Sequence, residues 1–184
     1  MARDLFWAKG YHATTIADLE AVTGLNRSSL YSTFGSKRGL FDRAIEDYLE
    51  WFVAPLLAAV EADGATPADA AELFASLAEH FRRDAARRGC LMTNSIAELA
   101  GSDEEFTVMG VAYMDRCRRA FLHAFRPALE GGLIAESQLE RRAATLVSAM
   151  MGAWLAARAD PAGAARTCSL MVEEIADWSP EAPI

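Results

Sequence analysis

The chain has 184 residues, of which 52% are hydrophobic and 24% charged, and its formal net charge at pH 7 is −8. This length and apolar content favour a globular fold with a sizeable core and exclude a disordered chain. The negative charge argues against nucleic-acid binding over the whole surface, but residues 1–43 carry +2 and the remainder −10. A basic end on an acidic body is compatible with one surface that meets phosphate.

The three cysteines, Cys90, Cys117 and Cys168, are widely spaced and form no C-x-x-C pair. Their odd number and spacing argue against a disulfide framework and against a zinc site. No secretory signal opens the chain, and its longest apolar run, residues 143–157, is too short for a bilayer. We therefore expect a cytoplasmic protein with no membrane partner.

A first short helix is expected over residues 3–9, and residues 14–37 (TTIADLEAVTGLNRSSLYSTFGSK) follow as two short helices joined by a turn. Thr15 and Asp18 have the spacing of a capping box at the start of the first of these two helices, and Gly24 is expected to end it. This helix has apolar residues at helical spacing and therefore one buried face.

Asn26 is a favourable cap for the next helix, which is predicted over residues 27–33. This helix buries Leu30 and is otherwise made of small polar side chains together with Arg27 and Tyr31. A helix, a turn that contains glycine and a second, polar helix are typical of a DNA-reading helix-turn-helix.

Helical periodicity continues through the rest of the chain, and no segment alternates with a period of two. Ser36 is expected to cap a long fourth helix that bends or ends at Pro55. Further helices are predicted over about residues 66–88, 91–99, 102–130, 137–159 and 160–180. The expected N-caps of four of these helices are Thr66, Ser102, Ser137 and Asp160. The predicted fold class is all-α with about nine helices.

Residues 10–41 resemble the N-terminal domain of the tetracycline-repressor (TetR) family of transcriptional regulators. The matching residues are Gly10, Tyr11, Thr14, Thr15, Ile16, Asp18, Leu19, Gly24, Leu25, Leu30, Tyr31, Phe34, Ser36, Lys37, Leu40 and Phe41. Asn26, Ser28 and Thr33 depart from the residues common in the family. These departures affect which bases are read, not whether DNA is bound. The family's first helix is usually longer than residues 3–9, so this helix is expected to be truncated.

The resemblance implies a helix-turn-helix DNA-binding domain over residues 1–44 and a helical ligand-binding and dimerisation domain over residues 45–184. It also implies a palindromic double-stranded DNA operator as partner, with phosphate contacts from Tyr31, Lys37 and Thr15. Arg27 has the fork that can grip guanine. The expected DNA-binding residues are Thr15, Asn26, Arg27, Ser28, Ser29, Tyr31, Ser32, Thr33 and Lys37.

The penultimate helix is apolar on almost all sides, so most of its surface must be covered. The residues alone leave open whether a partner subunit or the same chain covers it. The resemblance implies that the last two helices form a four-helix interface of a homodimer. The expected interface residues are Leu146, Met150, Ala153, Trp154, Ala157, Cys168, Met171, Val172 and Ile175.

The family also places a pocket for a small-molecule effector among the C-terminal helices. The candidate lining residues are Phe81, Cys90, Met92, Asn94, Tyr113, Cys117, Phe121, Met150 and Trp154. The segment from Gly89 to Asn94 is similar to a TetR subgroup that senses electrophiles and quinones, in which a cysteine is sometimes the sensing group. Cys90 is the candidate here, while a buried cysteine of purely structural role is the alternative.

We expect neither an enzyme nor a cofactor or metal. His12, His80 and His123 have no metal-ligand spacing, and the chain has no G-x-S-x-G and no phosphate-binding glycine loop. The predicted function is that of a dimeric regulator, most simply a repressor, released from its operator by a small hydrophobic or electrophilic effector. The alternative is a helical dimer that binds a small molecule or partner but no specific DNA.

Overall fold

A computed structural model describes residues 1–83 and 87–178, and within those residues the regular structure is entirely helical. The helices are α1 (Ala2–Lys9), α2 (Ile16–Thr23), α3 (Arg27–Phe34), α4 (Lys37–Tyr48), the π-helix η1 (Leu49–Val53), α5 (Ala54–Glu61), α6 (Pro67–Phe81), α7 (Leu91–Leu99), α8 (Glu104–Glu130), α9 (Glu136–Ala156) and α10 (Pro161–Trp178). Because α4, η1 and α5 follow one another without a break, the described part forms nine continuous helices, and the predicted all-α class is confirmed.

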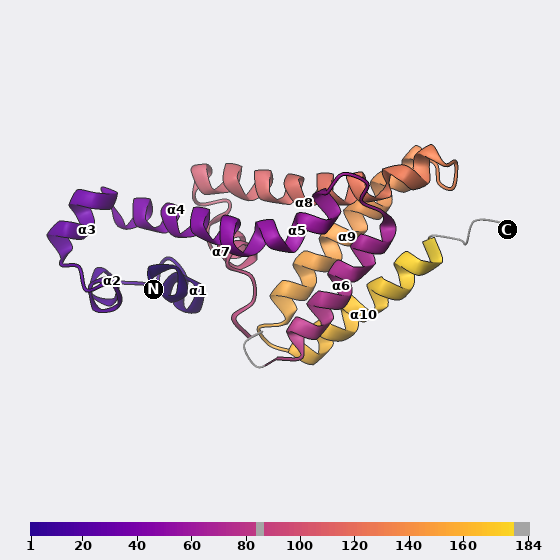
Figure 1. The fold of residues 1–184 in the computed structure, drawn as a ribbon. Coiled ribbons are helices and arrows are strands. Elements are labelled where there is room, and N and C mark those ends of the chain that lie inside the picture. The colour runs from indigo at the N-terminus through magenta and orange to yellow at the C-terminus, as the bar shows by residue number, and fades with distance from the viewer. Residues whose placement is uncertain (84–86, 179–184) are drawn as a thin grey trace.

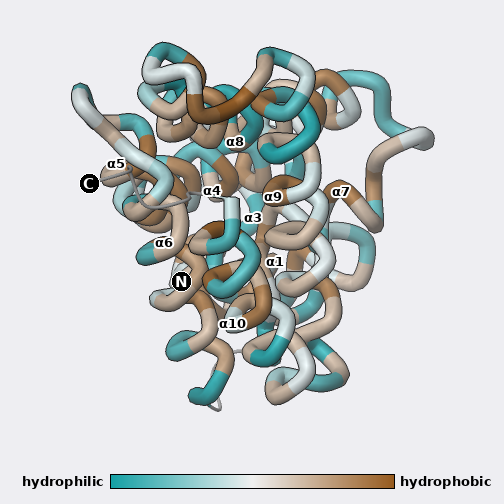
Figure 2. The backbone as a smooth tube through the Cα atoms, turned by 90° about the vertical axis from the view of Figure 1, so that its right-hand side faces the viewer, coloured by the Kyte–Doolittle hydropathy of each residue, from teal (hydrophilic) through white to brown (hydrophobic). Residues whose placement is uncertain are grey.

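The N-terminal helices α1–α3 form one end of the molecule, and α4 leads from them into a body made of the remaining helices (Figure 1). In the body, α10 packs against both α6 and α9, and α8 packs against α5 and α9. Hydrophobic and hydrophilic residues alternate around the helices (Figure 2), as expected for helices with one buried face. The buried hydrophobic residues form one core that runs from α1 through α4 into the body.

The junction between the N-terminal end and the body contains both buried apolar contacts and ion pairs. Phe41 of α4 is fully buried and packs edge-on against Phe6 of α1, with ring centres 5.1 Å apart. Arg38 of α4 forms ion pairs with Asp42 and with Asp103, the residue that caps α8. The first turn of α4 is therefore attached to the body as well as to the helix-turn-helix.

Pro55 neither ends the fourth helix nor breaks it, contrary to one reading of the sequence. The helix passes through one π turn, in which the Ala54 N–H bonds the Leu49 carbonyl, and it continues to Glu61. A proline lacks an N–H and clashes with the preceding turn, and the wider π turn directly before it accommodates the ring.

The prediction that α6 reaches about Arg88 is wrong, because α6 ends at Phe81. Phe81 is the last large apolar residue before Cys90, and it is buried. Further on, the carbonyl groups of Arg88 and Gly89 accept hydrogen bonds from the Trp7 indole.

Other helix ends also differ by one to three residues from the prediction, among them those of α8 and α9. Asp103, rather than Ser102, caps α8 by accepting the Phe106 N–H at 2.9 Å. The helix α9 begins at Glu136, ahead of Ser137, and ends at Ala156 rather than near residue 159. The predicted end of the last helix near residue 180 lies outside the described residues.

Most of the residues predicted for the dimer interface are instead buried within the chain itself. Leu146, Met150, Ala153, Trp154, Ala157, Cys168 and Ile175 are each no more than 2% exposed. A side chain that its own chain already covers has no surface left for a partner, so their assignment to the interface is corrected. Met171 and Val172 are half-buried. The exposed large apolar side chains of α9 and α10 are Leu155 and Leu170.

Candidate DNA-binding surface

The helix-turn-helix forms through the capping residues that the sequence predicts. Thr15 accepts the Asp18 N–H at 3.1 Å, and the Asp18 carboxylate accepts the Thr15 N–H at 2.9 Å, which completes the capping box. Gly24 then ends α2 in the left-handed conformation, with φ of 70°, where a side chain would be disfavoured.

The turn delivers α3 with its polar side outward. The Asn26 side chain accepts the Ser29 N–H at 2.9 Å and so caps the helix. The Glu20 carboxylate of α2 accepts the Arg27 N–H at 2.6 Å. Leu30 is only 4% exposed, so α3 is attached to its neighbours by this residue and by the hydrogen bond from Arg27 to Glu20.

Seven of the nine predicted DNA-binding residues are exposed in the described structure, and Ser29 and Lys37 are half-buried. The exposed ones are Thr15, Asn26, Arg27, Ser28, Tyr31, Ser32 and Thr33. The sequence therefore identified residues that the fold gathers at the N-terminal end of the molecule (Figure 1). This surface is available to a duplex.

Arg27 and Tyr31 lie one helical turn apart on α3 and interact. The Arg27 guanidinium lies 5.5 Å from the centre of the Tyr31 ring, within the range of a cation–π contact. Tyr31 keeps 37% of its surface exposed. The stacked pair presents a guanidinium and a phenol together, one suited to guanine or phosphate and the other to phosphate.

Thr15 has less free hydrogen-bonding capacity than the sequence suggested. Its N–H and its hydroxyl both donate to the Asp18 carboxylate, which also pairs with Lys9 at 2.8 Å. The Lys9 ammonium and then the Thr15 N–H and hydroxyl hold the pKa of Asp18 well below its usual range. A phosphate at this helix start would have to use other N–H groups of the first turn, since the Thr15 amide is occupied.

The nine predicted effector residues lie in the body, and most are packed into its core. Phe81, Cys90, Met92, Cys117, Phe121, Met150 and Trp154 are each no more than 1% exposed, and Tyr113 is 5% exposed. Asn94 is half-buried and lines a hollow with α1 residues, while Phe81 lines a separate one with residues from the start of α10. Most of the predicted lining residues therefore belong to the packed core of the body.

Cys90 occupies a defined position as the residue that caps α7. Its Sγ accepts the Thr93 N–H at 3.5 Å and lies 3.8 Å from the Tyr113 hydroxyl. Burial is the main cause that raises the pKa of Tyr113 and of Tyr48 well above the ordinary value. Burial likewise raises the pKa of Cys117 to about 12 and that of Cys168 to about 12. The thiols of Cys117 and Cys168 are therefore protonated at neutral pH.

Two functional contacts were missed at the sequence level. The Glu20 carboxylate accepts the Arg27 N–H, seven positions away in the chain. The Glu98 carboxylate accepts the N–H groups of Tyr11 and His12, which lie 87 and 86 positions away. The only local signal was Gly10, whose missing side chain leaves room for the Glu98 carboxylate.

No helix in the described part of the chain is long and apolar enough to cross a bilayer.

Comparison with known proteins agrees with this geometry. The fold and the surface define a helix-turn-helix protein of the kind that regulates transcription. The family model of bacterial regulatory proteins, tetR family, matches residues 1–44. The chain is 30% identical over 131 residues to the uncharacterized HTH-type transcriptional regulator YezE of Bacillus subtilis (strain 168). These residues cover 71% of this chain and 68% of YezE. The chain therefore belongs to the TetR family of regulatory proteins.

Two further similarities extend the comparison. The HTH-type transcriptional repressor ComR of Escherichia coli (strain K12) is 35% identical over 100 residues, which span 54% of this chain and 48% of ComR. Among solved structures, a cysteine mutant of the TetR family regulator CifR, in complex with 26-base-pair operator DNA, superposes with a TM-score of 0.78. That chain is 28% identical, and the superposition covers 97% of this chain and 93% of CifR.

Proposed function

We propose that this protein is a transcriptional repressor that binds a palindromic operator as a dimer and is released by a small hydrophobic or electrophilic effector. The observation that carries the proposal is the exposed polar face of α3 at one end of a TetR-like fold. In bacteria such an operator lies in the cytoplasm, so this function would place the protein there.

The DNA-binding part of the proposal is supported by the exposure of α3 and by the likeness to regulators that bind operators. A fold with one such helix reads few base pairs, so two copies would place their α3 helices in half-sites about 34 Å apart. The exposed apolar residues Leu155 of α9 and Leu170 of α10 are the natural centre of the contact between two copies. The two helices pack against each other.

Fluorescence anisotropy on DNA from upstream of the protein's own gene tests the proposal. Tight, salt-sensitive binding that resists random competitor DNA is expected, because phosphate contacts release counterions. Tyr31→Phe removes only the phenolic hydroxyl and keeps the ring beneath Arg27. Weaker binding by this variant at an unchanged salt slope is expected, since no charge is removed. Binding no tighter than to random DNA would favour a helical dimer without specific DNA recognition.

The effector part of the proposal rests on Cys90. Its thiol caps α7 and lies beside the Tyr113 phenol, so a covalent change there would alter the start of a helix that contacts α1. A quinone is a suitable electrophile: the sulfur adds to a ring carbon, the thiol proton goes to one quinone oxygen, and the hydrogen of the attacked carbon moves to the other oxygen. The product is a hydroquinone thioether. The adduct has no room in the core as it stands and would displace α7.

Release of operator DNA by p-benzoquinone is the test of this step. Loss of DNA binding by the wild type and by Cys117→Ser, but not by Cys90→Ser, is expected. If Cys90→Ser responds as the wild type does, Cys90 is not the sensing group and the quinone acts at another site.

A further inference from the structure

The turn between α1 and α2 is held by a carboxylate that comes from the body. Glu98, at the end of α7, accepts the Tyr11 N–H at 3.0 Å and the His12 N–H at 2.7 Å, one with each oxygen. Hydrogen bonds to an ionised carboxylate are stronger than those between neutral groups. One side chain therefore joins the helix-turn-helix to α7 across more than 80 positions of sequence.

Gly10 makes this close approach possible. A Cβ atom added to Gly10 would lie 2.6 Å from one Glu98 oxygen, so a side chain at this position would displace the carboxylate. Gly10 also has φ of +85°, a conformation that glycine adopts readily. Both the backbone conformation and the missing side chain at position 10 fit the carboxylate.

The turn that Glu98 holds is in contact with Lys37 and leads directly into Thr15, two of the predicted phosphate-binding residues. The Thr14 carbonyl oxygen accepts a hydrogen bond from the Lys37 ammonium at 2.8 Å. The same ammonium lies 4.4 Å from the centre of the Tyr11 ring, and Thr15 is the next residue after Thr14. A shift of residues 11 and 12 would thus move both Lys37 and the start of α2.

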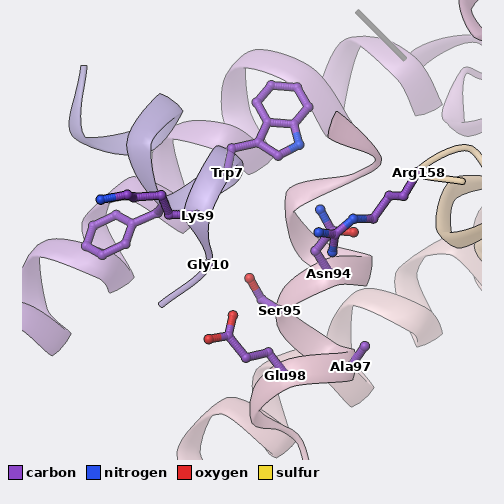
Figure 3. Close-up of a pocket in the computed structure, with 9 residues that line it drawn as sticks. Trp7, Lys9, Gly10, Asn94, Ser95, Ala97, Glu98 and Arg158 are labelled. Carbon is purple, nitrogen blue, oxygen red and sulfur yellow. The ribbon is translucent and has the colours of Figure 1, made fainter. Parts of the chain in front are cut away.

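The other end of α7 also contacts α1. The Trp7 indole N–H donates to the Arg88 and Gly89 carbonyls at 3.1 and 3.0 Å, just before Cys90. Trp7 and Gly10 line one side of a hollow of about 330 Å³, and Asn94 and Glu98 line the other (Figure 3). With hydrogen bonds near both of its ends, α7 is mechanically linked to the N-terminal helices.

We propose that Glu98 is a positioning residue for DNA recognition, which fixes the α1–α2 turn to α7 and carries a movement of α7 to Lys37 and Thr15. The inference rests on the DNA-binding function proposed above. A fixed turn holds the two α3 helices of a dimer at one separation, so its loss adds freedom that binding to two half-sites must remove.

The test is Glu98→Gln in the full chain, with the exposed Glu72→Gln of α6 as control for the removal of one negative charge. A carboxamide keeps one acceptor oxygen but places an NH₂ group against the second backbone N–H. Faster amide hydrogen exchange at Tyr11 and His12, with unchanged exchange in α8, is expected by NMR. Operator affinity should fall about three- to tenfold, as for the removal of one hydrogen bond.

The direction of the affinity change is diagnostic, because removal of a negative charge alone would tighten DNA binding. Glu98→Asp keeps the charge but shortens the side chain, so it should show the same local exchange and the same fall in affinity. Faster exchange throughout the protein with a lower melting temperature would assign Glu98 a general structural role and overturn the proposal. Unchanged operator affinity with faster exchange at residues 11 and 12 would overturn it as well.

The failure of the underlying function looks different. A wild type that does not distinguish its operator from random DNA would refute the proposed function itself. In that case the exchange rates of Tyr11 and His12 would still show whether Glu98 holds the turn. The proposed role of Glu98 in DNA recognition would nevertheless be refuted together with the DNA-binding function.

Discussion

The Lys37 ammonium donates a hydrogen bond of 2.8 Å to the Thr14 carbonyl oxygen, which ties the start of α4 to the residue before the cap of α2. These residues lie 23 positions apart and flank the helix-turn-helix on both sides. An ammonium has three donors, so this contact leaves others for a phosphate. Lys37, which is predicted to bind DNA, thus also joins the two ends of the helix-turn-helix.

Lys37→Ala is therefore expected to weaken operator binding and to lower the slope of log affinity against log salt by about one for each phosphate that the ammonium neutralises. Anisotropy titrations across a salt series measure both quantities. Arg119→Ala, which removes a positive charge from an exposed position of α8, is the control and should leave the slope unchanged. A variant of Lys37 with the wild-type slope would show that its ammonium serves only the internal contact.

The exposed and the buried faces of α9 give opposite predictions for assembly. Leu155→Glu puts a charge on a side chain that is 50% exposed, and it should yield a folded monomer in analytical ultracentrifugation. Trp154→Ala removes a fully buried ring and should lower the free energy of unfolding by about 3–5 kcal/mol. A Leu155→Glu variant that remains dimeric would exclude this face from the interface.

Acid sensitivity near neutral pH is expected from His80. Burial, and then Arg83, lowers the pKa of His80 below its ordinary value of 6.5. The unfolded chain then binds the proton more readily, so His80 lowers the free energy of unfolding as pH falls through 6.5 toward its folded pKa. Denaturant titrations between pH 7.5 and 5, at about half-unit steps, should show a shallower decline in His80→Gln than in the wild type. His12→Gln, at an exposed position, is the matched control.

The thiols of Cys117 and Cys168 should differ from free cysteine in their reaction with iodoacetamide. Cys117 and Cys168 are fully buried, and burial raises the pKa of each to about 12. Since the thiolate is the reacting species, their alkylation at pH 8 is expected to be far slower in the native protein than after unfolding in guanidinium. Mass spectrometry of the peptides measures each rate. Rapid native alkylation of Cys168 would contradict its place in the core.

The local features of the helix-turn-helix were predictable from the sequence. Thr15 with Asp18, Gly24, and Asn26 each act on backbone groups within four residues, so the residues in that short window suffice to specify the cap or the turn. The same reasoning assigned the exposed residues of α3, because only Leu30 and the terminal Phe34 interrupt its polar sequence.

Helix ends farther along the chain were less predictable. Ser102 and Ser137 had suitable spacing for caps, yet Asp103 caps α8 and α9 starts ahead of Ser137. Several neighbouring residues could cap these helices at similar cost, and the packing of the helix decides which one does so. Asp103 also pairs with Arg38 of α4, a contact that no local pattern specifies.

Local sequence patterns specify the all-α class, the helix-turn-helix and its polar helix, since each depends on the periodicity and caps of a few adjacent residues. Tertiary structure alone decided that α9 turns Trp154 inward and Leu155 outward, because an almost uniformly apolar helix does not specify its buried side. It also decided that Glu98 binds the turn at Tyr11 and His12. That contact exists only because packing brings α1 beside α7, and a carboxylate bonds whichever N–H groups the fold places before it.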